Sequence, residues 1–213
     1  MSAKTIIDNC RTSRSETGYA CINTKEVAVL IRARLKREFP GVKFSVRKTG
    51  YNSISIYWTD GPNGNAVDFV TQQYSFGGFD GMIDMAYYSD NWLLPDGSME
   101  TAVCRGTVGS RGTVPAFASD CPIPGAVMVS GGPQNVFTQR TQSQEEQRRI
   151  GRIVAEYYGW SIDHDKDYGC QYTPDGDNFS REIWRFEQSG RLEEIENPPV
   201  KVGLDWRPKV NAE

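Results

Sequence analysis

The sequence lacks the features by which several large classes of protein are recognised. None of its apolar runs approaches the roughly 20 residues that a membrane-spanning helix requires. The first 20 residues contain no apolar signal core, so we expect a cytoplasmic protein without a membrane partner. Five cysteines occur without any CxxC spacing, which favours reduced thiols over a disulfide framework.

Catalytic and metal-binding signatures are also scarce. His164 is the only histidine, and no nucleophile-elbow motif accompanies it to indicate a serine or cysteine hydrolase. Residues 163–169, DHDKDYG, carry acids at alternate positions as a calcium loop does. However, the glycine falls one position late, and Pro174 stands where the closing glutamate is needed. One histidine and widely spaced cysteines do not indicate a zinc site. We therefore predict a protein that is not an enzyme and that has no metal site and no cofactor.

Residues 76–84, FGGFDGMID, place glycines around an aromatic residue and an acid. They fit neither a P-loop, which needs Gly-Lys-Ser/Thr, nor a dinucleotide fingerprint, because they precede a strand-like run and not a helix. The pattern favours a bend whose glycines adopt positive φ. We expect this bend to place Asp84 and to deliver Ile83, Met85 and Tyr87 to the buried face of a strand.

What the sequence does contain is a set of helical and alternating patterns. Its 38% of hydrophobic and 24% of charged residues suit a globular chain and not a disordered one. Thr24 is the predicted N-cap of a helix that ends near Phe39, because Pro40-Gly41 cannot continue it. The apolar face of this helix is predicted to consist of Val27, Leu30, Ile31 and Leu35.

Two alternating runs, residues 42–47 and 53–58, predict a hairpin with one buried face. A short helix is expected over residues 65–74, before the strand that follows the glycine-rich bend. The resulting order is helix, strand, strand, helix, strand, so we predict an α+β fold in which a small, antiparallel-rich sheet packs with two to three helices. The side chains expected inside are Val42, Phe44, Val46, Ile54, Ile56 and Trp58 from the hairpin, and Val67, Phe69 and Val70 from the short helix.

Three regions are predicted along the chain. Residues 1–20 are polar and expected to be loosely held, residues 21–160 to form the α+β domain, and residues 161–213 to form an acidic C-terminal extension. Within the domain, residues 104–135 are rich in glycine and proline, which predicts a long, partly ordered loop. A capping box at Ser143 predicts a helix that ends at Gly159. Beyond it, the pattern allows either a hairpin around PDGD or a loop followed by a short helix.

Charge is distributed unevenly along the chain. Residues 24–48 carry eight basic and two acidic side chains, a net +6, whereas residues 161–213 carry twelve acidic and seven basic ones, a net −5. This asymmetry indicates nucleic-acid binding, two faces that attract each other, or an acidic tail that engages a protein.

Two groups of candidate binding residues follow from this charge distribution, each with an ordinary solvated surface as the alternative. The basic stretch has interleaved tyrosines, as single-strand-binding surfaces do. Its candidate nucleic-acid-binding residues are Arg32, Lys36, Lys43, Arg47 and Tyr57. The acidic tail combines carboxylates with aromatic side chains, which suits a protein partner with a basic groove. Its candidate partner-binding residues are Asp163, Asp165, Asp167, Asp175, Asp177, Tyr168 and Tyr172.

The stretches NTKEV (residues 23–27), FPGVKFSVR, SISIYWTDGP and FDGMIDMAYY together resemble a known small domain. It is the large polyvalent-protein-associated domain numbered twenty-nine in its series. The resemblance covers about residues 20–90 and, more loosely, NVFTQR and the helix that ends AEYYGW. It carries over no active-site residues, because the shared motifs are structural.

The resemblance implies a protein encoded by a phage or a conjugative element. Such proteins enter or act in the bacterial host alongside the DNA of the element and blunt the host's defences. It therefore implies a non-enzymatic protein that binds and inhibits a host defence complex, in the manner of anti-CRISPR or anti-restriction proteins. The alternative is a nucleic-acid-binding accessory protein of a mobile element.

Overall fold

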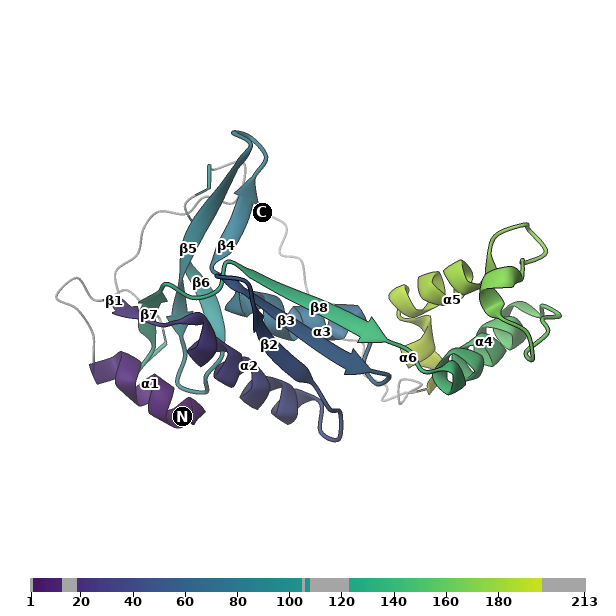
Figure 1. Cartoon of the computed structure of the whole chain (residues 1–213), viewed down its shortest axis with the longest axis horizontal. Coiled ribbons are helices and arrows are strands. Elements are labelled where there is room, and N and C mark those ends of the chain that lie inside the picture. Colours follow the sequence, from purple (N-terminus) through teal and green to yellow (C-terminus); the bar gives the residue numbers. More distant parts are fainter. Residues whose placement is uncertain (1, 13–18, 105, 108–122, 197–213) are drawn as a thin grey trace, which may run out of the picture. The chain divides into compact units, whose positions relative to one another are not determined.

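A computed structural model describes residues 2–12, 19–104, 106–107 and 123–196 (Figure 1). The chain forms two compact units, Met1–Ser143 and Gln144–Glu213. The predicted boundary after residue 160 is therefore wrong, because the helix before it belongs to the second unit.

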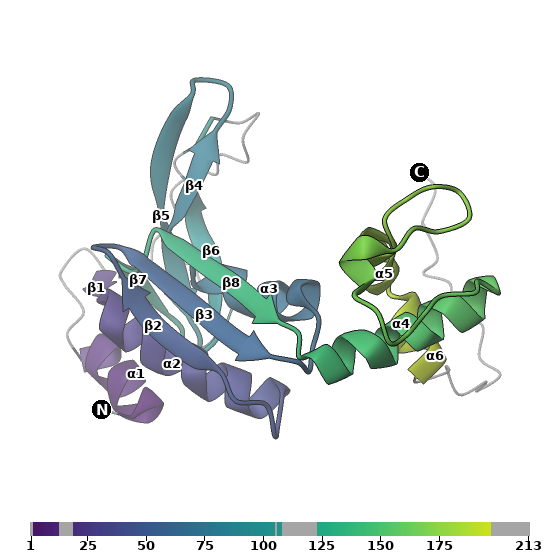
Figure 2. The ribbon, with the colours of Figure 1, turned by 45° about the vertical axis from the view of Figure 1, so that its right-hand side comes forward.

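The first unit has the predicted α+β fold, with helices and two mixed sheets (Figures 1 and 2). The expected order helix, strand, strand, helix is confirmed as α2, β2, β3 and α3, and the β4–β5 hairpin follows where one strand was expected. The three-stranded sheet has the order β2-β3-β8, formed by Ser45–Thr49, Ser53–Thr59 and Asn135–Thr141. The five-stranded sheet has the order β1-β7-β5-β4, with β6 also paired to β5. Its strands are β1 (Tyr19–Cys21), β4 (Gly77–Asp80), β5 (Met85–Leu93), β6 (Met99–Cys104) and β7 (Val127–Ser130). The helices are α1 (Ala3–Thr12), α2 (Thr24–Glu38) and α3 (Gly64–Thr71), which continues into the 3₁₀ turn η1 (Gln72–Tyr74).

Helix α2 begins at Thr24, one residue earlier than expected, because Thr24 itself was predicted to be the N-cap. Asn23 is the N-cap, and its side chain accepts the backbone N–H groups of Lys25 and Glu26 at 3.0 and 3.1 Å. The Glu26 carboxylate accepts the N–H of Asn23 at 2.9 Å, which completes a capping box. Thr24 is therefore the first helical residue, and it is buried. The predicted apolar face is confirmed, because Val27, Leu30, Ile31 and Leu35 are all buried.

The three-stranded sheet is covered on one face by two helices. Helix α2 packs against β2, and α3 packs against β8. Ile54, Ile56 and Trp58 of β3 are buried beneath them, as predicted. Together with Val46 they join the main apolar core of the first unit, and Val42 and Phe44 are partly buried against it. On α3, Val67 and Val70 are buried, but Phe69, which was expected to be buried, is 88% exposed.

The FGGFDGMID stretch forms a hairpin and not a single bend before a buried strand. Strands β4 and β5 pair from Gly77 opposite Tyr88 to Asp80 opposite Met85, and residues 81–84 form the turn. The predicted burial is wrong for Ile83 and Met85, which are exposed at 55% and 59%. The expected positive φ of the glycines is also wrong within this stretch, since Asp84 is the residue that adopts it, at 54°.

The first two glycines of this stretch are required by close contacts. A Cβ atom at Gly77 would lie 2.3 Å from the Gln134 side chain, and one at Gly78 would lie 2.4 Å from the ring of Tyr87. Both distances are far below van der Waals contact. These glycines therefore let the base of the hairpin approach its neighbours closely.

Two segments that were expected to be irregular contribute to the core. Residues 3–12 form α1, whose Ile6, Ile7 and Cys10 are buried, so the expectation of a loosely held segment is wrong for these residues. Burial raises the pKa of the Cys10 thiol to about 11. Within the predicted loop, residues 127–130 form β7, which lies between β1 and β5. Most of the rest of that loop, residues 105 and 108–122, lies outside the described residues.

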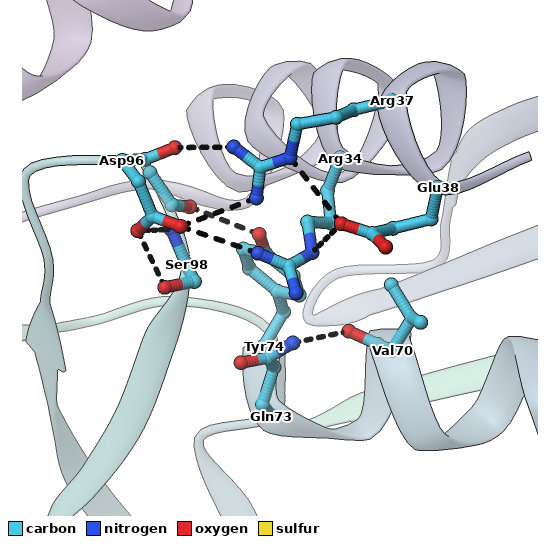
Figure 3. A network of polar contacts seen from close by, with 9 residues as sticks. Arg34, Arg37, Glu38, Val70, Gln73, Tyr74, Asp96 and Ser98 are labelled. Carbon is cyan, nitrogen blue, oxygen red and sulfur yellow. Dashed lines mark hydrogen bonds and ion pairs between the residues drawn. The ribbon is translucent and has the colours of Figure 1, made fainter. Parts of the chain in front are cut away.

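An ion-pair network joins the end of α2 to the turn between β5 and β6 (Figure 3). Arg34 and Arg37 each contact both Glu38 and Asp96, at distances between 3.1 and 3.3 Å. Beneath them, the buried Tyr74 hydroxyl donates to a carbonyl of the turn at 2.9 Å. The network therefore links the helix that covers the three-stranded sheet to the five-stranded sheet.

The second unit is helical. Its elements are α4 (Gln144–Tyr158), the 3₁₀ turn η4 (Tyr168–Cys170), α5 (Phe179–Gln188) and α6 (Arg191–Glu196). Both alternatives beyond residue 160 hold in part, because a bridge pairs Tyr172 with Asn178 across the PDGD turn and a helix follows. The interpretation of this segment as an extension is wrong for its described part, since it forms a shared core with α4. The buried residues of this core are Ile150, Val154, Ala155, Tyr168, Phe179, Ile183, Phe186 and Leu192.

Candidate nucleic-acid interface

The helices leave one face of the three-stranded sheet uncovered, and this open face presents two aromatic side chains. Tyr57 of β3 pairs with Gln139 of β8, and Phe137 of β8 pairs with Ser55. Because side chains alternate between the faces of a strand, Tyr57 and Phe137 both point away from the buried Ile56. They are diagonal neighbours on adjacent strands, with exposures of 39% and 57%. The open face consists of Ser45, Arg47, Thr49, Ser53, Ser55, Tyr57, Thr59, Asn135, Phe137, Gln139 and Thr141.

The open face carries positive charge and no carboxylate. Strands β2, β3 and β8 contain no aspartate or glutamate, and Arg47 is the basic residue among the side chains of the open face. The Nε of Arg47 donates to the Ser45 hydroxyl at 2.9 Å, which holds the guanidinium along the strand. Arg32 reaches the edge of the same sheet from α2, where its Nη2 donates to the carbonyl of Val46 on β2.

The structure brings together some of the five candidate nucleic-acid-binding residues that were predicted in the basic stretch. Arg47 and Tyr57 share the open face, and Lys43 lines a cavity with Tyr57 at one end of it. Arg32 lies beside the edge of β2, and Lys36 is exposed one helical turn further along α2. Their binding role stays a prediction.

Phe137 was missed, because sequence reasoning did not place β8 in this sheet. The signal available in the sequence was the run from Val136 to Thr138, whose β-branched and aromatic residues are typical of a strand.

The predicted acidic residues lie in the loop between α4 and α5 of the second unit, where several have local partners. Asp163 accepts the N–H of Asp165 at 3.1 Å, and its ion pair with Lys166 at 3.0 Å helps to hold the pKa of its carboxyl below the ordinary value. Asp167 caps η4 by accepting the N–H of Gly169 at 2.7 Å.

The other predicted residues of this group differ in accessibility. Asp177 pairs with Arg185 at 2.7 Å, and Asp175 lies exposed in the turn before it. Tyr172 is 67% exposed, but Tyr168 is buried and packs edge-on against Phe179. Tyr168 is therefore part of the core of the unit, and the remaining acidic-tail residues stay predicted contacts.

The β4–β5 hairpin presents a second surface, of a different kind. Its outer part projects from the rest of the first unit (Figures 1 and 2). The buried Asp80 stiffens it, because its carboxylate accepts the N–H of Met82 at 2.9 Å and the N–H of Thr107 at 2.6 Å. The exposed apolar side chains of this hairpin tip are Phe79, Met82, Ile83, Met85 and Tyr88.

Two properties of the described residues bear on the class of site. No three histidine, cysteine, aspartate or glutamate side chains gather there in an arrangement that could hold a metal ion. Across the same residues, every helix is too short or too polar to cross a bilayer.

The fold and the open face together define a small α+β domain with a solvent-facing sheet. A family model for large polyvalent protein associated domain 29 matches residues 22–143, more than half of the chain. The chain belongs to this family, which associates it with phages and other mobile elements. The match ends where the first unit ends, so it includes the open face and the hairpin tip. Neither a curated protein nor a solved structure matches the chain.

Proposed function

We propose that the chain is a non-enzymatic binding protein that holds single-stranded nucleic acid on the open face. The observation that carries this proposal is the pair of exposed aromatic side chains, Tyr57 and Phe137, on adjacent strands that contain no carboxylate. Bases stack on such rings irrespective of sequence, because every base has a π-face.

The geometry favours unpaired strands over a duplex. In a duplex the base faces are already stacked on each other, so a ring that projects from a sheet can reach only splayed, unpaired bases. Arg47 lies on the same face, where its guanidinium can contact the phosphates that connect the stacked bases. Arg32 and Lys43 extend the positive charge around the edge of the sheet. The helix-covered face offers no comparable aromatic surface, because its aromatic side chain, Trp58, is buried.

The test is fluorescence anisotropy with a labelled 12-residue oligothymidylate at low salt. Phe137→Ser should weaken binding by about tenfold, since stacking contributes about 1–3 kcal/mol per base. Phe69→Ser is the matched control, because Phe69 is an exposed aromatic on α3, which covers the opposite face. Equal affinities of the two variants would contradict the proposal, as would absence of wild-type binding.

The contribution of the charged residues to binding should appear in the salt dependence of the affinity, measured by the same titration. For single strands, log K falls with log salt with a slope of about −0.7 per phosphate contact. Arg47→Gln should therefore make the slope shallower by about 0.7. An unchanged slope would show that the open face does not contact phosphate through this residue.

A protein partner is the second candidate, and the hairpin tip is the observation that favours it. Between Lys48 and Arg105 the chain contains seven acidic residues and no lysine or arginine. The hairpin tip lies in this segment, so it combines exposed apolar side chains with negative charge. Such a surface suits a protein with an apolar cleft and a basic rim, and not the phosphates of a nucleic acid. In a mobile-element protein, a host defence complex of the CRISPR or restriction type is the candidate partner.

This second candidate can be tested by phage plaquing on bacteria that carry a CRISPR or restriction system. Expression of the chain should raise the plaquing efficiency, and the double variant Met82→Ser, Ile83→Ser should reduce that effect. Phe69→Ser is again the control, since it removes an exposed apolar group elsewhere on the unit. Inhibition that is insensitive to the hairpin changes would place the contact elsewhere, with the acidic loop of the second unit as the next surface to vary.

A further inference from the structure

A cavity of about 620 Å³ adjoins the open face at the C-terminal end of β3. Tyr57 belongs to both, because it lies on the open face and also lines the cavity. The other wall comes from the chain that enters β2, where Lys43 and Ser45 line the cavity. Its volume lies within the range of about 300–1,000 Å³ that small-ligand sites occupy.

The two turns that border the cavity adopt left-handed conformations. Gly41, with φ of 90°, ends the turn after α2, and Asp60 and Gly61, with φ of 59° and 67°, turn the chain away from β3. The second turn is held firmly to the end of β8. The Asp60 carboxylate accepts the N–H of Ser143 at 2.7 Å, and Arg140 donates to the carbonyl of Gly61 at 3.0 Å. The cavity is therefore preformed, and a ligand need not order its walls.

The lining combines an aromatic ring with a small set of polar groups. Thr59 and Thr141 contribute from the ends of their strands, and Asp60 and Lys43 contribute opposite charges. A carboxylate is an acceptor with about four lone-pair positions, so the bond from Ser143 leaves it capacity for further donors. An aromatic side chain together with a hydrogen-bond acceptor is typical of sites that bind an unstacked base, since the ring stacks on the base and the acceptor bonds its Watson–Crick edge.

We propose that this cavity seats one base of the bound strand and that Asp60 makes guanine the preferred base. The inference rests on the proposed single-strand binding by the open face. Guanine is the base that presents two adjacent N–H donors, at N1 and N2, on its Watson–Crick edge, and a carboxylate can accept both. Thymine and uracil present a single N–H between two carbonyl oxygens, which a carboxylate repels. Lys43 also lines the cavity, and its ammonium group supplies the positive charge that would contact the phosphate next to the seated base.

The test compares two labelled probes, a 12-residue oligothymidylate and the same strand with one central guanine. The wild type should bind the guanine probe about tenfold more tightly, the scale of one good bidentate contact. Asp60→Asn should remove this preference, because an amide replaces one acceptor by a donor. The variant keeps an oxygen for the Ser143 N–H, and asparagine tolerates the left-handed conformation.

Asp84→Asn is the matched control. Asp84 is the other non-glycine residue with positive φ in the described ranges, but it lies in the hairpin turn, away from the cavity lining. It should retain the tenfold preference. If Asp84→Asn loses the preference as Asp60→Asn does, the assignment to the cavity is overturned.

The outcomes separate this inference from the proposed function. Equal wild-type affinity for the two probes would overturn the guanine site while leaving the open face as a single-strand platform. Binding of neither probe would overturn both. Free guanosine monophosphate serves as a competitor: if it displaces the probe as well as the unlabelled strand does, the cavity is a site for a free nucleotide and not for a base of a strand.

Discussion

The two hairpins of the first unit share their local sequence signals but differ in their surroundings. The β2–β3 hairpin has one face buried beneath α2 and α3, and its open face carries positive charge. The β4–β5 hairpin has exposed apolar side chains at its end and lies in a segment without lysine or arginine. In both, apolar residues alternate with others and glycine lies at or near a turn. Alternation therefore identifies a strand, but it does not show which face a helix will cover.

The two hairpins also differ in the interactions that make them rigid. Apolar burial holds the β2–β3 hairpin, whereas the β4–β5 hairpin depends on the buried carboxylate of Asp80 and on glycines that permit close contacts. The different charges of the two surfaces are the reason why we propose a polyanion as the partner of the first and a protein as the partner of the second.

The largest effect on stability is expected for a buried isoleucine of the β2–β3 hairpin, and an exposed isoleucine of the β4–β5 hairpin serves for comparison. Ile56→Ala should lower the free energy of unfolding by about 2–5 kcal/mol, because Ile56 is fully buried and the change leaves a cavity. Ile83→Ala should change it by less than about 0.5 kcal/mol, because Ile83 is 55% exposed. Denaturant melts of both variants check this, and similar losses would show that the hairpin tip is covered in solution.

An intermediate effect is expected at the base of the β4–β5 hairpin. Gly77→Ala should cost about 1–3 kcal/mol, because its Cβ would lie 2.6 Å from the backbone oxygen of Gln134, which cannot move freely. Gly81→Ala is the control within the same hairpin, since a Cβ there meets nothing within 4 Å. Thermal melts should show that Gly81→Ala unfolds near the temperature of the wild type. If both variants lose stability equally, the cause is the loss of backbone flexibility at glycine and not the contact with Gln134.

The smallest effect concerns pH and the network that ties α2 to the β5–β6 turn. Partial burial raises the pKa of Asp96, but hydrogen bonds from Ser98 and Arg37 outweigh it, so the pKa lies below its ordinary value. Because the folded-state pKa is depressed, the stabilisation is present above the unfolded-state pKa and is lost as the pH falls through the folded-state pKa. The pairs are half-exposed, so we expect less than about 1 kcal/mol.

The measurement is the pH dependence of urea unfolding for the wild type and Asp96→Asn. The variant should be less stable near neutral pH. The difference should begin to shrink below about pH 4, where the carboxyl of the unfolded chain gains its proton, and should continue to shrink through the lower folded-state pKa. A constant difference across this range would attribute the effect of the substitution to packing and not to charge.

Much of the fold and part of the candidate site could be predicted from local patterns. The buried face of α2, the β2–β3 hairpin and the family resemblance all rest on residues close together in the chain, where periodicity reports burial directly. Arg47 and Tyr57 of the candidate interface follow from the same hairpin. The prediction of Thr24 as the N-cap was wrong because Asn23 forms a complete capping box with Glu26, which places the first helical turn one residue earlier.

The sequence by itself thus determined α2, the β2–β3 hairpin and α3, the side chains that α2 and β3 bury, and the positive charge of the open face of the hairpin. Only the tertiary structure decided which strands pair across long separations. It places β8 beside β3, which brings Phe137 next to Tyr57, and it places β7 between β1 and β5. It also decided that Ile83 stays exposed and that the second unit begins at Gln144. The physical reason is that a pattern records only that a strand has an apolar side, whereas burial of that side depends on an element elsewhere in the chain.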